Sequence, residues 1–238
     1  MTDITDGHRG SIHVLWAWLA VFVGANLAST FVVVATGHAT TPSSQMPTWV
    51  LALGALGMWT VSLFVVGRYE VHTNVAPMLV RRSLCLTFSP RDLWGIPVGV
   101  LSQFVLVPAV NWPLQRIFPD TFSFDQVSRR AKDLVLGAHG VSMILLILVV
   151  VVGAPLVEEI IYRGMVHRDV VKAWGPTIGT IFTAALFAAI HLTPVEFPGL
   201  FAFALVLGVT RERTGTLGLP IVSHLAFNAA GLFLVALS

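Results

Sequence analysis

Long apolar runs, separated by short polar segments, extend along the whole chain. Seven such runs cover residues 12–35, 48–66, 93–110, 141–162, 177–192, 197–209 and 217–236. A helix needs about 20 residues to cross the ~30 Å hydrocarbon core of a bilayer, and the runs lack the period-two alternation of a membrane β-barrel. The pattern therefore predicts an all-α, polytopic transmembrane bundle of about seven helices, or eight if one more segment enters the membrane.

The most polar long stretch, residues 111–134, lies between the third and fourth runs. It predicts a surface loop that contains a short amphipathic helix. We therefore divide the chain into residues 1–134, with the N-terminal membrane helices and this polar loop, and residues 135–238, with a C-terminal helical core. Nothing in the sequence indicates that either part folds independently.

Arginines are distributed unevenly among the loops. The loop after the first run has no Lys or Arg, whereas the next loop has Arg68, Arg81, Arg82 and Arg91. Because cytoplasmic loops are enriched in these residues, the N-terminus is predicted to be cytoplasmic. Strict alternation would then place the cations of residues 111–134 outside, which conflicts with the rule unless a segment there is interfacial or re-entrant.

Composition narrows the class of protein. Hydrophobic residues make up 55% of the chain, charged residues only 11%, and the mean hydropathy is +0.82, whereas about a quarter of a soluble domain is charged. The net charge of +2, without a basic stripe, argues against nucleic acid as a partner. The single cysteine, Cys85, excludes an internal disulfide and a cysteine-built metal site. These features predict an integral membrane protein surrounded by lipid.

Two adjacent carboxylates, Glu158 and Glu159, interrupt an apolar run in the second half of the chain. Charge inside a membrane costs a few kcal/mol per group, so both are functional candidates. Arg163 follows Glu159 by four residues, one helical turn, with the glutamate on the favourable N-terminal side. Adjacent helical residues point ~100° apart, so Glu158 faces elsewhere. This geometry assigns Glu159 to Arg163 and leaves Glu158 as the reactive carboxylate.

Two histidines lie in later apolar runs, and each has a partner one helical turn away. Phe187 precedes His191 by four residues, and Asn228 follows His224 by four, so each pair shares a helix face. An imidazole and a carboxamide at this spacing can direct two hydrogen-bond donors at one point. Such a pair is what a developing oxyanion requires.

The depth of these residues indicates a shared site. Residues 174–176, Trp-Gly-Pro, predict a turn between two antiparallel helices. At ~1.5 Å rise per residue, Glu158 and His191 would both lie about 25 Å from this turn and therefore level with each other. Pro155 should loosen the helix beside the glutamates and free backbone carbonyls.

These residues form three short motifs in chain order: Glu158-Glu159-x-x-x-Arg163, Phe187-x-x-x-His191 and His224-x-x-x-Asn228. The series resembles the CPBP family, the CAAX prenyl endopeptidases and their bacterial relatives associated with bacteriocin processing and immunity. The resemblance covers roughly residues 149 to 230, under half of the chain. It implies a membrane endopeptidase, a peptide hydrolase in the plasma membrane of a bacterium or archaeon.

The resemblance also implies roles for the motif residues. Glu158, with help from His191, would activate a water, and His224 with Asn228 would stabilise the tetrahedral oxyanion. The supporting residues of the site would be Glu159, Arg163 and Phe187. The implied partner is a peptide or protein substrate at the membrane, C-terminally processed or lipidated in part of the family.

The involvement of a metal is open at this point. Glu158, His191 and His224 would make a three-ligand zinc site with an open water position, and the family is often described as metalloproteases. However, the chain lacks an HExxH helix, and a glutamate-activated water needs no ion. We therefore expect no required cofactor, with zinc as the alternative.

Two other functions fit the same residues. A non-catalytic membrane scaffold or bacteriocin-immunity protein would use them as a buried ion pair, an interfacial histidine capped by a carbonyl, and interhelical hydrogen bonds. An ion-coupled transporter would place Glu158 and Glu159 on its ion path, although no inverted repeats with broken helices are visible. Substitution of Glu158 separates these functions, because only the endopeptidase would lose cleavage.

Overall fold

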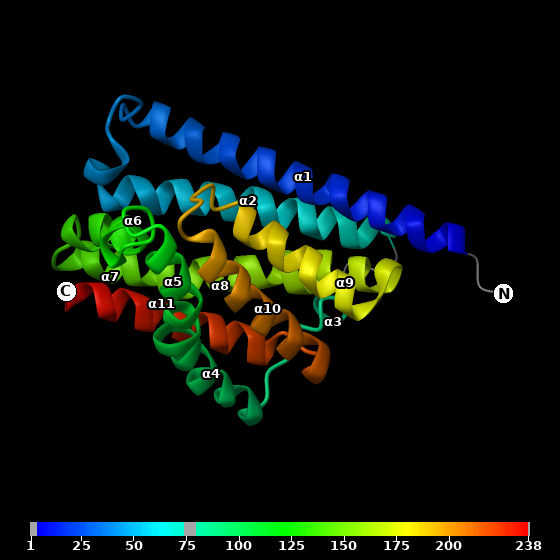
Figure 1. Cartoon of the computed structure of the whole chain (residues 1–238). Helices are drawn as coiled ribbons and strands as arrows, with labels where there is room; N and C mark the ends of the chain where they lie inside the picture. The colour runs from blue at the N-terminus through cyan, green and yellow to red at the C-terminus, as the bar shows by residue number, and fades with distance from the viewer. Residues whose placement is uncertain (1–3, 74–79, 238) are drawn as a thin grey trace.

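The computed structural model describes residues 4–73 and 80–237, and the regular structure within these ranges is entirely helical. The first two helices, α1 (Ile4–Ala35) and α2 (Thr48–Thr73), lie side by side and antiparallel (Figure 1). Both contain a segment long and apolar enough to cross a membrane. The first two predicted runs are therefore a helical hairpin.

The third run is one continuous helical segment, Pro90–Ile117, that follows the short helix α3 (Val80–Ser83). It consists of η3 (Pro90–Trp94), α4 (Gly95–Leu101), the π-helical η4 (Ser102–Leu106) and α5 (Val107–Ile117). α4 packs closely against the last helix of the chain, where a Cβ on Gly99 would collide with the carbonyl oxygen of Ser223. Glycine at this position is therefore required for the close approach of the two backbones.

Residues 111–134 differ in part from the predicted loop. α5 continues through Ile117, and α6 (Phe124–Leu136) supplies the predicted amphipathic helix. The hydroxyl of Ser123 caps α6 by accepting a hydrogen bond from the N–H of Gln126 at 3.3 Å. The loop prediction was wrong for residues 111–117, because helical hydrogen bonding continues past the point where the apolar composition stops.

The next segment, Val141–Ala189, is a helical hairpin of 49 residues. Its elements are α7 (Val141–Ile147), the π-helical η5 (Leu148–Gly153), α8 (Ala154–Glu159), the π-helical η6 (Ile160–Val166) and α9 (His167–Ala189). Gly175, with φ 81° and ψ 166°, breaks the helix, a conformation that glycine adopts without steric cost. The rings of Tyr162 and Phe187, one from each arm, lie 5.2 Å apart. The predicted turn at residues 174–176 is thus present.

The chain ends with α10 (Phe197–Thr214) and α11 (Gly218–Ala236). Gly215, with φ 70°, closes α10 in the left-handed conformation. The all-α bundle is confirmed, with five segments of the described chain long and apolar enough to cross a membrane. The count is lower than seven because the Val141–Ala189 hairpin contains two predicted runs and because α10 ends in the charged residues 211–213.

The hydrophobic core joins both halves of the chain. Val14 of α1, Val66 of α2, Met165 of η6 and Val170 of α9 are buried in one cluster. Figure 1 places α6 and the C-terminus at one end of the bundle, which we call the α6 end. The turn within α9 and the turn between α10 and α11 lie at the opposite end, which we call the turn end.

Candidate active site

A helix with two π turns carries the adjacent glutamates. α8 ends at Glu158 and Glu159, and the π-helical η5 and η6 flank it. η5 lies directly against α2, since a Cβ on Gly153 would collide with the ring of Trp59. π turns are rare in proteins overall, but those that occur are often found at functional sites. The two π turns therefore mark the helix of Glu158 and Glu159 as a candidate functional element.

Pro155 links this helix to α11. In the π register of η5, the N–H of Ala154 donates to Val149 O, five residues back. The next donor in that register would be residue 155, and proline has no N–H. Val150 O is therefore left without its helical donor, and it accepts a hydrogen bond from Asn228 Nδ2 at 2.8 Å.

The pair of Glu159 and Arg163 is completely enclosed. Their side chains are 0% and 1% exposed, and Arg163 Nη1 donates to Glu159 Oε1 at 3.0 Å. Nη2 donates to the carbonyl of Ala204 in α10 at 3.1 Å, and the guanidinium lies 4.7 Å from the ring centroid of Phe187. A buried charge needs such partners, and the arginine thereby ties η6 to α9 and α10.

His224 is the second partner of the same carboxylate. Its Nδ1 lies 2.8 Å from Glu159 Oε1, so Nδ1 carries a proton and donates it to the carboxylate. Its Nε2 lies 3.7 Å from Glu158 Oε2, and the rings of Phe187 and Phe203 pack edge-on against the imidazole. Glu159 therefore orients His224 toward Glu158, a contact that the sequence analysis missed because it assigned Glu159 to Arg163 alone.

His191 lies at the end of the other arm of the hairpin. Its Nδ1 donates to the carbonyl oxygen of Phe187 at 2.9 Å, which is the carbonyl cap expected for a merely structural histidine. This bond occupies only one ring nitrogen and leaves Nε2 free. His191 and Glu158 line one cavity, which agrees with their predicted equal depth.

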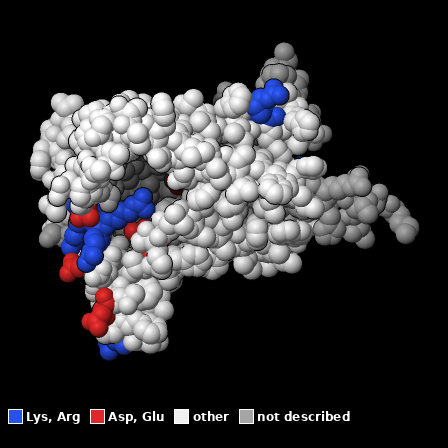
Figure 2. Space-filling view, turned by 90° about the horizontal axis from the view of Figure 1, so that it is seen from above, with Lys and Arg blue, Asp and Glu red and all other residues white. Residues whose placement is uncertain are grey.

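The cavity has a volume of about 540 Å³ and brings the motif residues together. Its lining includes Glu158, Phe187, His191, His224 and Asn228, whereas Glu159 and Arg163 are buried behind it. The molecule is hollowed on one face, with Lys and Arg side chains gathered beside the hollow (Figure 2). Glu158 is 26% exposed, so it is the accessible carboxylate of the adjacent pair.

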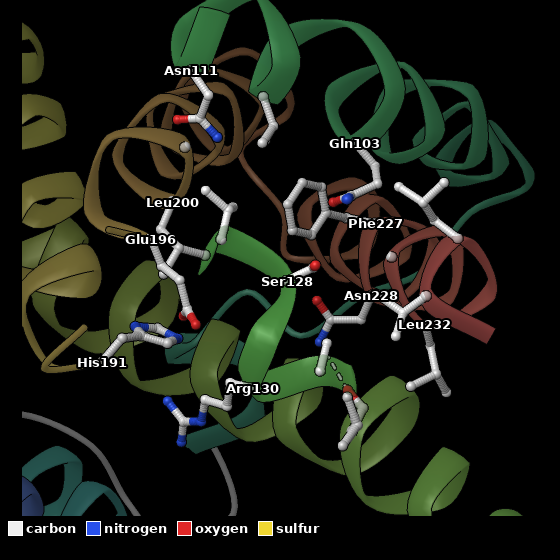
Figure 3. Close-up of a pocket in the computed structure, with 18 of the residues that line it drawn as sticks. Gln103, Asn111, Ser128, Arg130, His191, Glu196, Leu200, Phe227, Asn228 and Leu232 are labelled. Atoms are coloured by element: carbon white, nitrogen blue, oxygen red, sulfur yellow. Dashed lines mark hydrogen bonds between the residues drawn. The ribbon is translucent and has the colours of Figure 1, made fainter. Parts of the chain in front are cut away.

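Besides Gln115 and Ser128, four further polar residues line this cavity and were not identified from the sequence. They are Gln103, Asn111, Arg130 and Glu196 (Figure 3). Burial raises the pKa of Glu196 above its ordinary value of 4.5, while Arg130 and His191 act in the opposite direction. Gln103 interrupts an apolar run, and that break was the only sequence signal for any of the four.

The candidate zinc donors at the cavity are one carboxylate and two imidazoles, those of Glu158, His191 and His224. Among the residues that the structure describes, no three His, Cys, Asp or Glu side chains are grouped so that they could hold a metal ion. Nδ1 of His191 and Nδ1 of His224 are each engaged by protein oxygens. What the cavity offers is one accessible carboxylate beside two imidazole nitrogens, the groups that general acid–base chemistry on a water needs.

Comparison of the chain with known proteins identifies related sequences. A family model described as "Type II CAAX prenyl endopeptidase Rce1-like" matches residues 140–230, which contain all seven motif residues. The "Uncharacterized 24.3 kDa protein" of Escherichia coli is 34% identical over 188 residues, which cover 75% of this chain and 77% of that protein. No solved structure matches the chain.

Proposed function

We propose that this chain is an intramembrane endopeptidase with Glu158 as its general base, because it belongs to the Rce1-like family of type II CAAX prenyl endopeptidases. The observation that supports this role is the position of Glu158. Its carboxylate opens to the cavity, and His224 stands 3.7 Å away, held by the buried pair of Glu159 and Arg163. The accessible carboxylate is therefore backed by a buried ion pair that also holds the histidine.

In the proposed reaction, Glu158 takes a proton from a water in the cavity. The oxygen of that water attacks the carbonyl carbon of the scissile peptide bond, and Nε2 of His191 orients the water. The proton then passes from Glu158 to the nitrogen of the leaving amine as the C–N bond breaks. A positioned general acid–base of this kind contributes about 10²–10⁴-fold to the rate.

The negative oxygen of the tetrahedral intermediate needs donors on the opposite side. The imidazole of His224, whose Nδ1 donates to Glu159, directs its Nε2 at this oxygen. The amide of Asn228 has a second N–H besides the one held by Val150 O, and that N–H is the other donor. Loss of one such donor lowers kcat by about 10²–10³-fold.

We further propose that no metal ion is required, because one carboxylate and two imidazoles already supply the base and the donors. The substrate is a peptide segment of a membrane-associated protein, C-terminally processed or lipidated, in the plasma membrane of a bacterium or archaeon. The chelator arm of the following experiment tests the metal proposal.

The test is a comparison of membrane-protein termini from cells that express the wild type, Glu158→Gln or Glu212→Gln. The product termini should fall by about 10²–10⁴-fold with Glu158→Gln. Glu212→Gln is the matched control, because Glu212 pairs with His167 away from the cavity lining. Purified wild type should keep its activity after chelation, with no stoichiometric metal in elemental analysis.

Two outcomes would overturn these proposals separately. Unchanged termini with a folded Glu158→Gln protein would remove Glu158 as the base and favour the scaffold or immunity function. Loss of activity on chelation, with recovery on addition of zinc, would instead retain the peptidase and remove the metal-free mechanism.

A further inference from the structure

Two carboxamides from the third membrane segment line the cavity. Gln103 lies in η4 and Asn111 lies in α5, and both line the cavity. Figure 3 shows both on the wall opposite His191 and Arg130. We call these two residues the carboxamide wall. It lies outside residues 140–230, the part that the family model matches.

The carboxamide wall has unused hydrogen-bonding capacity. Asn111 Oδ1 is buried and has no partner, and the side chain of Gln103 makes no hydrogen bond within the described residues, where it packs beside Gly231. Buried polar groups are nearly always hydrogen-bonded, and leaving one unpaired costs free energy. A ligand that satisfies these amides would offset that cost, whereas a lipid chain could not.

The π turn sets the spacing of the two amides. Two turns of α-helix contain about seven residues, and the π-helical η4 accommodates one more. Gln103 and Asn111, eight residues apart, thus lie on the same face. At ~1.5 Å rise per residue they are separated by about 12 Å along the helix, which is the length of about four residues of extended chain at ~3.3 Å each.

A carboxamide offers both a donor and an acceptor, and a peptide group needs both. We infer that the carboxamide wall binds the main chain of an extended, apolar substrate segment of about four residues, opposite Glu158. The site would recognise the backbone and tolerate many side chains, because the rest of the lining is largely apolar. The position of the scissile bond beside Glu158 rests on the proposed function, whereas the binding itself does not.

The experiment measures binding apart from cleavage. The probe is the peptide Leu-Val-Ala-Leu-Val-amide with a fluorophore on its N-terminus, together with its analogue in which every backbone nitrogen is methylated. Binding is measured by anisotropy with the full-length Glu158→Gln protein in detergent, alone or with Gln103→Leu or Asn111→Leu. Asn26→Leu is the matched control, since Asn26 is exposed on α1 and bonds only to Phe22 O of its own helix.

Each wall substitution should weaken binding of the unmethylated peptide about 10-fold, while Asn26→Leu has no effect. Methylation should weaken binding to the parent protein to a similar level and remove the difference between the variants. The melting temperature of Asn111→Leu should equal or exceed that of the parent, because the substitution removes an unpaired buried oxygen. Equal affinity in all variants, or a lower melting temperature of Asn111→Leu, would overturn the inference.

Failure of the proposed function would give a different pattern. If the wild type cleaves nothing but the wall substitutions still weaken peptide binding, the carboxamide wall stands and the peptidase does not. If the wild type cleaves its substrate and both wall variants do so with unchanged KM, the peptidase stands and the carboxamide wall is overturned.

Discussion

Glu196 is the second carboxyl group that lines the cavity, besides Glu158, and it comes from the segment between α9 and α10. Burial raises its pKa above the ordinary glutamate value, while Arg130 and His191 act in the opposite direction. A group whose pKa is higher in the folded state than in the unfolded state stabilises the fold below the unfolded pKa. That stabilisation is lost as the pH rises through the folded pKa.

We therefore expect Glu196 to make the protein less heat-stable as the pH rises from 4.5 toward neutral. Relative to Glu196→Gln, the melting temperature of the wild type should fall by about 2–4 °C over this range. Melting curves of both proteins in one detergent, at several pH values, measure the difference. Parallel curves would show that burial does not govern the ionisation of Glu196.

Glu159 illustrates what a sequence can predict at the scale of a residue. Its pairing with Arg163 follows from a spacing of four residues on one helix, because local geometry alone brings them together. Its bond to His224 joins residues 65 positions apart. That contact depends on how α11 packs against α8, which no local pattern contains.

At the scale of elements, the π turns adjust the register of the helices that form the cavity. η5 leaves the carbonyl of Val150 without a helical donor, so that it can accept a hydrogen bond from Asn228. η4 brings Gln103 and Asn111 onto one face of their helix. η5 lies within a uniformly apolar stretch, and the stretch around η4 is interrupted only by Ser102 and Gln103, so hydropathy could not reveal either turn. The turn at Gly175 was predictable, by contrast, because glycine followed by proline has a direct backbone consequence.

The link between Pro155 and Asn228 predicts a non-additive effect on stability. Asn228→Leu leaves Val150 O without its donor and should lower the free energy of unfolding by about 1–3 kcal/mol. Pro155→Ala supplies an N–H to the same carbonyl in the π register, so Asn228→Leu should cost much less in that background.

Melting temperatures of the two single variants and the double variant give the coupling directly. Additive losses would contradict the proposed register. Peptidase activity should remain low in the double variant, because it still lacks the amide of Asn228.

At the scale of the whole molecule, the two ends of the bundle carry different numbers of cations. The segments at the turn end contain Arg68, Arg81, Arg82, Arg91, Arg168, Lys172, Arg211 and Arg213, whereas those at the α6 end contain Arg116, Arg129, Arg130 and Lys132. The excess predicts that the turn end is cytoplasmic. The amphipathic α6 then lies at the outer interface, which resolves the conflict that strict alternation of the loops created.

This orientation can be tested with cysteines in a Cys85→Ala background. Thr121→Cys, at the α6 end, should react with a membrane-impermeant maleimide in intact cells, because Thr121 is exposed. Thr214→Cys, exposed at the turn end, should react only after the cells are permeabilised. The reverse pattern would place the α6 end in the cytoplasm and the turn end outside.

The carboxamide wall and the catalytic groups come from separate stretches of the chain, and this has an evolutionary consequence. The glutamates and histidines lie within residues 140–230, whereas Gln103 and Asn111 come from Pro90–Ile117. Mutations in the earlier stretch can therefore change which peptides fit while every group that performs the chemistry is preserved. Paralogues can therefore diverge in substrate preference before they diverge in mechanism. A chimera that exchanges only residues 90–117 should have the substrate preference of the protein that donates them.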